Sequence, residues 1–200
     1  YLRNLEERKQ EVIRLIDEQG KLTEDLKNEI LQADVLQKVE DLYRPFRQKR
    51  STRATKAKEK GLEPLAELIL KQKVTKGTIE ELAEPFINEE LEVNTVEDAI
   101  NGAKDIIAEI ISDNAKYREK IRKLNFSKGI INSTAVDEKE KTVYEMYYNF
   151  NEPVNKIANH RILAINRGEK QKKLKVKLIS PDDEIIKYLS KFHNLKTLIL

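Results

Sequence analysis

The stretch from Thr95 to Ile111 places the strongest constraint on the fold, because its apolar residues recur with helical spacing over a wide face. Thr95 is a favourable N-cap residue, and acidic side chains follow it in the first turn, as is common where helices begin. A helix with so wide an apolar face must be buried against other elements. We therefore expect it to be the central helix of the structure. Its apolar face is formed by Ala99, Ile100, Ala103, Ile106, Ile107, Ile110 and Ile111.

Composition supports a helical protein and excludes several kinds of site. Of the 200 residues 36% are charged and 39% hydrophobic, which suits amphipathic helices with solvated outer faces. Six glycines and five prolines leave few tight turns, so a many-stranded sandwich or barrel is not expected. The absence of cysteine excludes disulfides, thiolate metal sites and cysteine nucleophiles, and it fits a cytoplasmic protein. No apolar run approaches the 18 residues of a membrane span, so we expect no membrane partner.

The chain before residue 125 is expected to be helical throughout. Apolar residues spaced along Leu2–Ile16, after Thr23 and after Asp34 predict three short helices that pack as a bundle, the last ended by Pro45. A basic loop and a helix from Arg53 follow, in which Ala54, Ala57 and Gly61 form a small-residue face. Further helices are expected from Pro64, from Thr78 to Pro85, and over Asn114–Leu124.

The character of the sequence changes near Phe126. The β-branched segment Gly129–Val136 and the alternating segment Lys173–Ile179 are expected to pair as a small antiparallel ribbon. Helices are expected over Thr142–Phe150, Arg161–Glu169 and Asp182–Phe192. The predicted fold class is therefore mostly α, a multi-helical structure with one two-stranded antiparallel β-ribbon. The expected organisation is a helical region over 1–125 and a helical region with the ribbon over 126–193.

Two segments carry most of the positive charge. Tyr43–Lys60 (the first basic segment) has a net charge of +7 and Arg161–Lys177 (the second basic segment) one of +6, so the remaining residues sum to −10. Such asymmetry can mark contact with a polyanion. The alternative is a set of solvated faces whose cations pair with acidic neighbours. For Arg47, Lys49, Arg50, Arg53 and Lys56 these would be carboxylates from Glu7 to Glu40 or from Glu80 to Glu97. The candidate nucleic-acid-binding residues are Arg44, Arg47, Lys49, Arg50, Arg53, Lys56, Arg161, Arg167, Lys173 and Lys175.

The five central cations of the first basic segment are expected to be exposed and to form one positive surface. They are Arg47, Lys49, Arg50, Arg53 and Lys56.

No constellation of catalytic residues is recognisable in the sequence. Lys76-Gly77-Thr78 lacks the glycine-rich lead of a phosphate-binding loop, and His160 and His193 lie far apart. The tyrosines of Thr142–Phe150 are more typical of core packing than of base stacking. We therefore expect no enzyme activity, no catalytic residues, no metal and no cofactor.

Long runs of the sequence resemble the bacterial transcription accessory protein family Tex. The similarity is carried, in the same order as in the family, by Glu7–Ile30, Val39–Ile69, Glu97–Arg122 and His160–Leu178. It implies a cytoplasmic, nucleic-acid-binding protein of transcription whose N-terminal half is an elongated helical scaffold with a helix-turn-helix-like unit. The RNase-H-like, helix-hairpin-helix and RNA-binding OB-fold domains that follow in the family are not in this sequence. In the family, the OB-fold domain is the main nucleic-acid contact.

The resemblance also bears on how the chain is organised. It assigns the helix-turn-helix-like unit to the basic part of 1–125, and it relates 194–200 to the linker before an RNase-H-like domain. Several family helices are missing between the segment that resembles Pro181–Leu189 and this linker, so we expect a discontinuity close to His193–Asn194. The chain begins with Tyr1 rather than Met, which predicts a piece of a longer protein.

The resulting hypothesis is an N-terminal scaffold fragment of a nucleic-acid-binding transcription accessory protein. Its basic segments would add auxiliary, sequence-independent contacts to the phosphate backbone of RNA or DNA. The transcription machinery is a further candidate partner, and we expect a monomer. The alternative is a structural or protein-interaction module with no nucleic-acid contact of its own.

Overall fold

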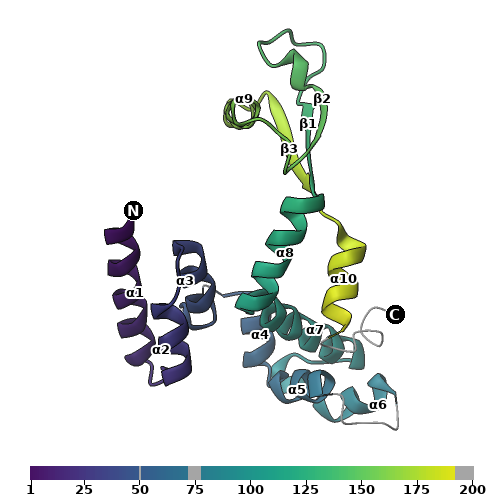
Figure 1. The fold of residues 1–200 in the computed structure, drawn as a ribbon. Helices are drawn as coiled ribbons and strands as arrows, with labels where there is room; N and C mark the ends of the chain where they lie inside the picture. Colours follow the sequence, from purple (N-terminus) through teal and green to yellow (C-terminus); the bar gives the residue numbers. More distant parts are fainter. Residues whose placement is uncertain (50, 72–77, 192–200) are drawn as a thin grey trace. The chain divides into compact units, whose positions relative to one another are not determined.

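The computed structural model describes residues 1–49, 51–71 and 78–191 (Figure 1). The expected mostly α fold is confirmed, and the residues form two compact units. Residues up to Arg118 belong to unit 1, and residues from Glu119 belong to unit 2. The two units meet between Arg118 and Glu119, within helix α8 (Ala115–Lys128). The boundary that the sequence analysis places between residues 125 and 126 lies in the same helix. Segment 194–200 and the expected discontinuity near His193–Asn194 lie outside the described residues.

The first core of unit 1 is a three-helix bundle of α1 (Leu2–Asp17), α2 (Glu24–Leu31) and α3 (Leu36–Tyr43). The predicted stripes supply its buried residues, which are Leu5, Val12, Ile16, Ile30, Ala33, Val39 and Leu42. Thr23 caps α2 through its side chain, as expected. The sequence favours Asp34 as the N-cap of α3 and Val35 on its apolar face, but Val35 is the N-cap and its side chain is exposed.

The second core of unit 1 surrounds the long helix α7 (Val96–Asp113). Thr95 and Asp98 form a capping box at its start, and Ile106 is completely buried, so the predicted central helix is confirmed. Ile110 is the exception on the predicted apolar face, with 42% of its surface exposed. The elements around α7 are η1 (Arg44–Phe46), α4 (Arg53–Glu59), α5 (Glu63–Lys71), α6 (Ile79–Ala83), η2 (Glu84–Phe86) and η3 (Glu89–Leu91).

Helix α4 approaches α7 through small side chains. Ala54 and Ala57 are buried in the core around α7, as expected. Gly61 lies beyond the end of α4 and is exposed, so it does not extend this small-residue face. Its φ of 77° lies in the left-handed region, which glycine adopts without strain and which suits the residue after a helix.

Unit 2 contains a three-stranded antiparallel sheet in the order β2-β1-β3, rather than a two-stranded ribbon. The expected pairing of β1 (Ile130–Ala135) with β3 (Leu174–Ile179) is present. The strand that the sequence analysis missed is β2 (Asn149–Pro153). The helix expected over Thr142–Phe150 is wrong, because only a short turn of 3-10 helix, η4 (Glu145–Tyr147), precedes that strand.

Helix α9 (Asn159–Lys170) packs against one face of this sheet, which we call the inner face (Figure 1). Ile165 is buried there with Leu174, and Tyr144 and Tyr147 join the same core, in agreement with the expected packing role of the tyrosines. The approach is close, because a Cβ atom added at Gly168 would lie 2.6 Å from Leu174 Cδ1. The alternate residues of the three strands, such as Asn132, Asn151 and Lys175, lie on the opposite side of the sheet. We call this side the outer face, and it is largely exposed.

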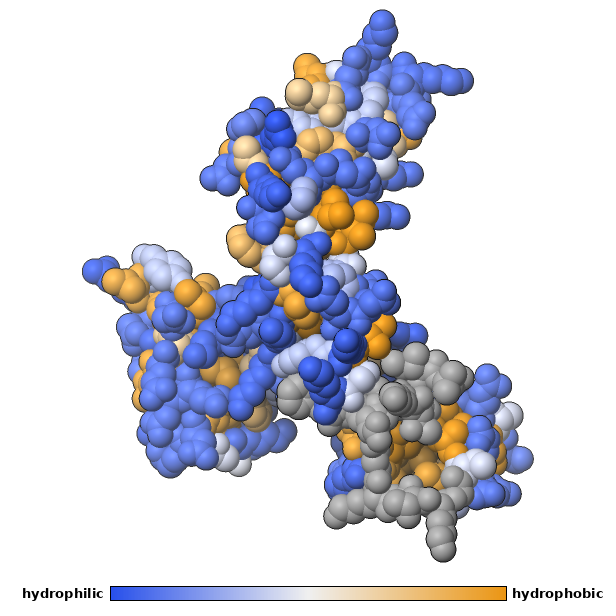
Figure 2. Space-filling view, turned by 45° about the vertical axis from the view of Figure 1, so that its right-hand side comes forward, coloured by the Kyte–Doolittle hydropathy of each residue, from blue (hydrophilic) through white to orange (hydrophobic). Residues whose placement is uncertain are grey.

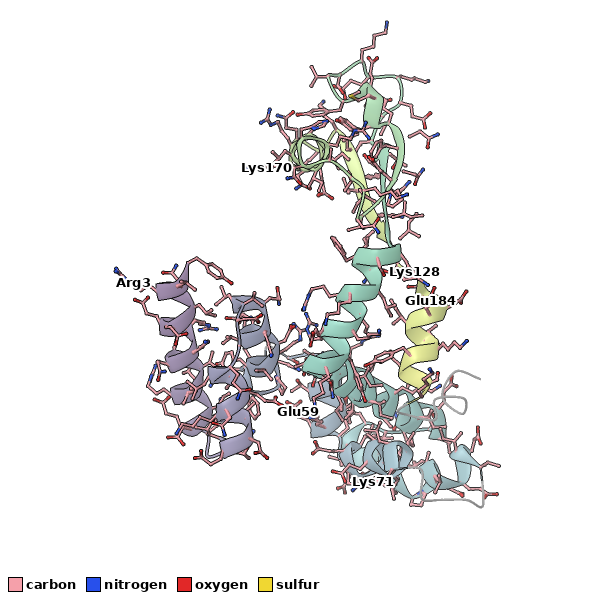
Figure 3. All side chains as sticks on the ribbon, in the orientation of Figure 1. Arg3, Glu59, Lys71, Lys128, Lys170 and Glu184 are labelled. Atoms are coloured by element: carbon pink, nitrogen blue, oxygen red, sulfur yellow. The ribbon has the colours of Figure 1, made fainter. Side chains whose placement is uncertain are left out.

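Helix α10 (Asp182–Ser190) follows the sheet and contacts the part of α8 that belongs to unit 2. Lys128 Nζ donates to Glu184 Oε1 at 2.5 Å, and these two side chains point toward each other (Figure 3). Lys120 Nζ lies 5.9 Å from the ring centroid of Tyr188. Hydrophilic residues cover most of the surface visible in Figure 2, with apolar residues gathered in smaller patches.

Candidate nucleic-acid interface

The first basic segment lies against an acidic side of α7. Arg44, at the end of α3, donates from Nε to Asp113 Oδ1 at 2.9 Å. Lys49 Nζ contacts the other oxygen of Asp113 and also lies 3.2 Å from Glu109 Oε1. Asp113 is itself largely buried, so its charge is stabilised by two cations that reach it from one side.

Three carboxylates on α7 account for this arrangement, and we call them the acidic stripe. Asp105, Glu109 and Asp113 follow one another at intervals of four residues, which places them on one side of the helix. Arg53 Nε lies 3.5 Å from Asp105, although 87% of the Arg53 side chain is exposed. The Thr52 hydroxyl, which caps α4, lies 3.1 Å from Glu109.

The proposed sources of paired carboxylates, Glu7–Glu40 and Glu80–Glu97, are wrong for Lys49 and Arg53, and Arg44 behaves in the same way. Their partners come instead from α7, more than 50 positions away in the sequence. The spacing of four between the acids of the stripe was the available signal, because it places all three beside the apolar face of a helix that had to be buried.

Arg47 and Lys56 differ from these paired cations. Both are exposed, and no carboxylate pairs with either among the described residues. Arg47 lines a hollow of about 500 Å³ together with Lys49 and Lys58, while Lys56 lines a smaller one of about 250 Å³. Lys49 was expected to be exposed, but only 24% of its side chain is accessible, and Arg50 lies outside the described residues.

The second basic segment also divides into paired and unpaired cations. Arg161 donates to Glu152 at 2.7 Å, and this hydrogen bond raises the pKa of the guanidinium above its ordinary value. Lys173 donates to Glu140 at 2.5 Å, and that hydrogen bond likewise raises the pKa of the ammonium group. Arg167 and Lys175 are exposed, and neither has a carboxylate partner within the described parts of the chain.

The ten candidate residues are divided between the two units. Those of the first basic segment belong to unit 1 and those of the second to unit 2, so each unit presents its own candidate surface. Five of the ten are paired with carboxylates, and they are Arg44, Lys49, Arg53, Arg161 and Lys173. Four are exposed without such a partner in the described structure, and they are Arg47, Lys56, Arg167 and Lys175.

Comparison with known proteins identifies the family. Residues 75–199 match the family model described as Tex central region-like. The chain belongs to the Tex family. The similarity seen in the sequence is therefore confirmed, and it extends over more than half of the chain.

Individual relatives match nearly the whole Tex-family chain. The uncharacterized protein YdcI of Bacillus subtilis is 54% identical over 194 residues, which cover 96% of this chain and 27% of YdcI. The transcriptional accessory protein Tex of Neisseria gonorrhoeae is 35% identical over 198 residues, 98% of this chain and 26% of that protein. The human S1 RNA-binding domain-containing protein 1 is 27% identical over 187 residues, 88% of this chain and 18% of that protein. The chain thus spans about a quarter of the length of its bacterial relatives.

Sequence reasoning overlooked part of the exposed polar surface of unit 2 in this Tex-family chain. Lys177 stands beside Lys175 on the same side of β3, and its cross-strand partner on β1 is Asn132. Asn132 Nδ2 donates to Asn151 Oδ1 of β2 at 2.9 Å. The alternation of Lys173–Ile179 indicated the lysine face, but the asparagines could be placed beside it only once β2 was known.

The described residues of the Tex-family chain provide neither a metal site nor a membrane span. Within residues 1–49, 51–71 and 78–191, no group of three or more His, Cys, Asp or Glu side chains is placed so that it could hold a metal ion. In the same residues, no helix combines the length and apolar character needed to cross a membrane.

Proposed function

We propose that this chain is a scaffold part of a nucleic-acid-binding transcription accessory protein and that it adds sequence-independent contacts to the phosphate backbone of RNA or DNA. Family membership supports the first half, since a relative covering 98% of the chain is named transcriptional accessory protein Tex. The name of the human relative, S1 RNA-binding domain-containing protein 1, supports nucleic acid as the partner. On this proposal the chain acts as a cytoplasmic monomer, with no cofactor and no catalytic activity of its own.

The observation that carries the backbone contact is the exposure of unpaired cations beside α4. The acidic stripe neutralises Arg44 and Lys49, but Arg47 and Lys56 remain accessible and have no carboxylate partner among the described residues. Exposed, mobile cations of this kind contact phosphates without reading the base sequence. Arg167 and Lys175 offer the same chemistry in unit 2.

The helix-turn-helix-like unit implied by the family is best assigned to α4 and α5. Residues 60–62 connect the two helices, and Gly61 takes a left-handed conformation in this turn. A turn of three or four residues that contains glycine is typical of helix-turn-helix units. Lys56 and Lys58 lie on α4, so the assignment places unpaired or weakly paired cations on the first helix of the unit.

The test is a salt titration of the 200-residue chain against single- and double-stranded RNA and DNA oligonucleotides. The double variant Arg47→Gln, Lys56→Gln should bind more weakly than the wild type. Its slope of log affinity against log salt should fall by about 1.4–1.8, the value for two lost phosphate contacts. A matched control is Lys21→Gln, Lys38→Gln, which removes two exposed cations outside both basic segments. Equal slopes for the wild type and the Arg47, Lys56 variant would remove this surface from nucleic-acid binding.

A second candidate function is a structural or protein-interaction module without nucleic-acid contact, for instance one that meets the transcription machinery. It is favoured by the pairing of half of the candidate cations with carboxylates, because paired cations stabilise the fold and attract phosphates less. The same titration separates the two functions. If the wild-type chain fails to bind any of the four oligonucleotides at low salt, the structural function is the one to retain.

A further inference from the structure

The outer face of the sheet in unit 2 has a composition that strand formation alone does not explain. Its residues are in register across all three strands, so they stand side by side on one surface. One row is Asn151–Asn132–Lys177, the next is Asn149–Thr134–Lys175, and the last is Pro153–Ile130–Ile179. Each polar row thus runs from an asparagine on β2 to a lysine on β3.

Asparagine is depleted in strands, yet three of the six residues in the polar rows are asparagines. A residue type with a low preference for strands, at a position where its side chain gains no packing, indicates a functional role. Asn132 Nδ2 donates to Asn151 Oδ1 at 2.9 Å, which leaves the Asn132 carbonyl oxygen, one N–H of Asn132 and both N–H groups of the Asn151 amide available to a ligand. The face therefore presents hydrogen-bonding amides beside positive charge.

The charge of this face is also uncompensated. Lys175 and Lys177 are exposed, and neither forms an ion pair with a carboxylate in the described parts of unit 2. None of the nine residues in the three rows is acidic. Lys173 continues the same side of β3, but its ammonium group is held by Glu140. The cations of the face thus form a single line along one edge strand.

We propose that the outer face binds a single strand of nucleic acid, with phosphates along the lysines of β3 and sugar or base edges over the amides of β1 and β2. The inference rests on the proposed function and names the form of nucleic acid that unit 2 takes. Successive lysines on one side of a strand are about 7 Å apart, and β2 lies about 10 Å from β3. A surface of these dimensions offers phosphate contacts to one chain.

A duplex fits this surface poorly. Its base edges are turned inward and are reached only through the grooves, which a flat sheet face does not enter. In a single strand the bases are free to turn toward the protein. Since none of the nine residues is aromatic, base stacking contributes nothing here, and little preference among base sequences is expected.

The decisive experiment measures binding of fluorescent single-stranded RNA, single-stranded DNA and duplex DNA to the 200-residue chain. Lys175→Gln, Lys177→Gln should weaken single-strand binding about tenfold at 200 mM salt and roughly 70-fold at 50 mM, with a salt slope lower by about 1.4. Duplex binding should change much less. The two single-stranded probes show whether ribose hydroxyls add to the contact.

The matched control is Lys170→Gln, Lys172→Gln, which removes the same charge from the end of α9 and the turn after it (Figure 3 labels Lys170). It should retain wild-type affinity for the single strand. Equal losses in the control and in the Lys175, Lys177 variant would show a diffuse electrostatic effect and would overturn the proposal.

A third variant tests the amides. Asn132→Thr places a strand-favouring residue on the face, so the chain should be at least as stable as the wild type. Its affinity for the single strand should nevertheless fall about two- to tenfold, with an unchanged salt slope, because one hydrogen-bonding group and no charge is lost. A less stable variant with wild-type affinity would assign the asparagines to the fold instead.

The outcomes also separate this inference from the proposed function. If the Arg47, Lys56 variant loses affinity while the Lys175, Lys177 variant does not, the outer face is excluded and the proposed function stands. If the wild type binds no oligonucleotide, both fail. Lysines on an edge strand can also prevent pairing with another sheet. If the Lys175, Lys177 variant self-associates and keeps its affinity as a monomer, that role replaces the one proposed here.

Discussion

The two basic segments have nearly the same net charge in the sequence, +7 and +6, yet they present different surfaces. In the first, Arg44 and Lys49 converge on Asp113 of α7. In the second, Lys175 and Lys177 stand in line on β3 and face only uncharged cross-strand neighbours. The difference shows that local charge density predicts a positive surface only when the element packed beside the segment is known.

The cause lies in the two periodicities. A helix returns to the same side every three or four residues, so acids spaced by four form a continuous stripe along α7. A strand alternates sides, so every second residue of β3 reaches the outer face, while Leu174 and Val176 on the other side pack in the core. The neighbouring positions on β1 are Asn132 and Thr134, which cannot neutralise a lysine.

The largest expected effect comes from the helix that carries the acidic stripe. Ile106→Ala should lower the free energy of unfolding by about 2–4 kcal/mol, because the Ile106 side chain is completely buried and its truncation leaves a cavity. Urea unfolding followed by circular dichroism measures the change. Ile110→Ala, on the same helix but 42% exposed, serves as the control and should lose less. Equal losses at both positions would contradict the orientation of α7.

The corresponding variant in unit 2 tests the packing beneath β3. Gly168→Ala adds a methyl group 2.6 Å from Leu174 Cδ1 and 3.2 Å from Tyr144, so the side chain of Leu174 or Tyr144 must shift. A loss of about 1–3 kcal/mol in stability is expected from such overpacking. Near-ultraviolet circular dichroism should report the disturbed tyrosine. Asn166→Ala, an exposed position of α9, should have little effect, and a stabilised Gly168→Ala protein would show that α9 lies farther from the sheet.

The difference between the two basic segments is tested by Asp113→Asn. This change removes the carboxylate that pairs with Arg44 and Lys49. These cations of the first basic segment thereby become more like the outer-face lysines of the second, which stand beside uncharged cross-strand neighbours. Loss of the shared carboxylate should reduce stability by about 1–2 kcal/mol, since two charge-assisted contacts are weakened. Affinity for single-stranded and duplex oligonucleotides should rise at low salt, because Arg44 and Lys49 become available. Glu97→Gln makes the same charge change in the first turn of α7, and it should leave both quantities nearly unchanged. If both variants gain affinity equally, net charge rather than the acidic stripe controls binding.

The smallest effect is expected at the start of α4. The Thr52 hydroxyl accepts from the N–H of Thr55 at 3.0 Å, and Thr52→Ala should cost about 1 kcal/mol in unfolding free energy, as for other N-caps. Thermal unfolding can resolve this change. Ser51→Ala, one residue earlier, should be neutral, because Ser51 is exposed and lies outside the cap. A larger loss at Ser51 than at Thr52 would move the helix start.

The sequence predicted best those helices in which a capping residue at the start and the apolar spacing of the interior indicate the same element. Thr23, Thr78 and Thr95 cap helices as expected, and the interior of α7 follows from its apolar spacing. Strand β2 was missed because it has five residues, three of them polar, and Phe150 alone of its side chains joins the core. Its conformation is imposed by pairing with β1 rather than by local preference.

The candidate site was predicted less well than the fold, for a related reason. Lys49 and Asp113 are 64 positions apart, and the spacing of the acids on α7 does not indicate which segment packs against them. Exposure of Arg53 and Lys56 followed from the small residues that turn α4 toward the core. The partners of Arg44 and Lys49 required knowledge of which side of α7 faces the segment.

The strand order of unit 2 has a consequence for how the protein is made. The central strand β1 leaves the ribosome first and β3 last, so only the β1–β2 hairpin can form early. At about 5–20 residues per second, the 26 residues between the ends of β2 and β3 take roughly 1–5 s to synthesise. During that interval Ile131 and Phe150 lack their later partners from α9 and β3. Until α9 and β3 follow, the nascent hairpin therefore exposes apolar side chains through which it can associate with other chains.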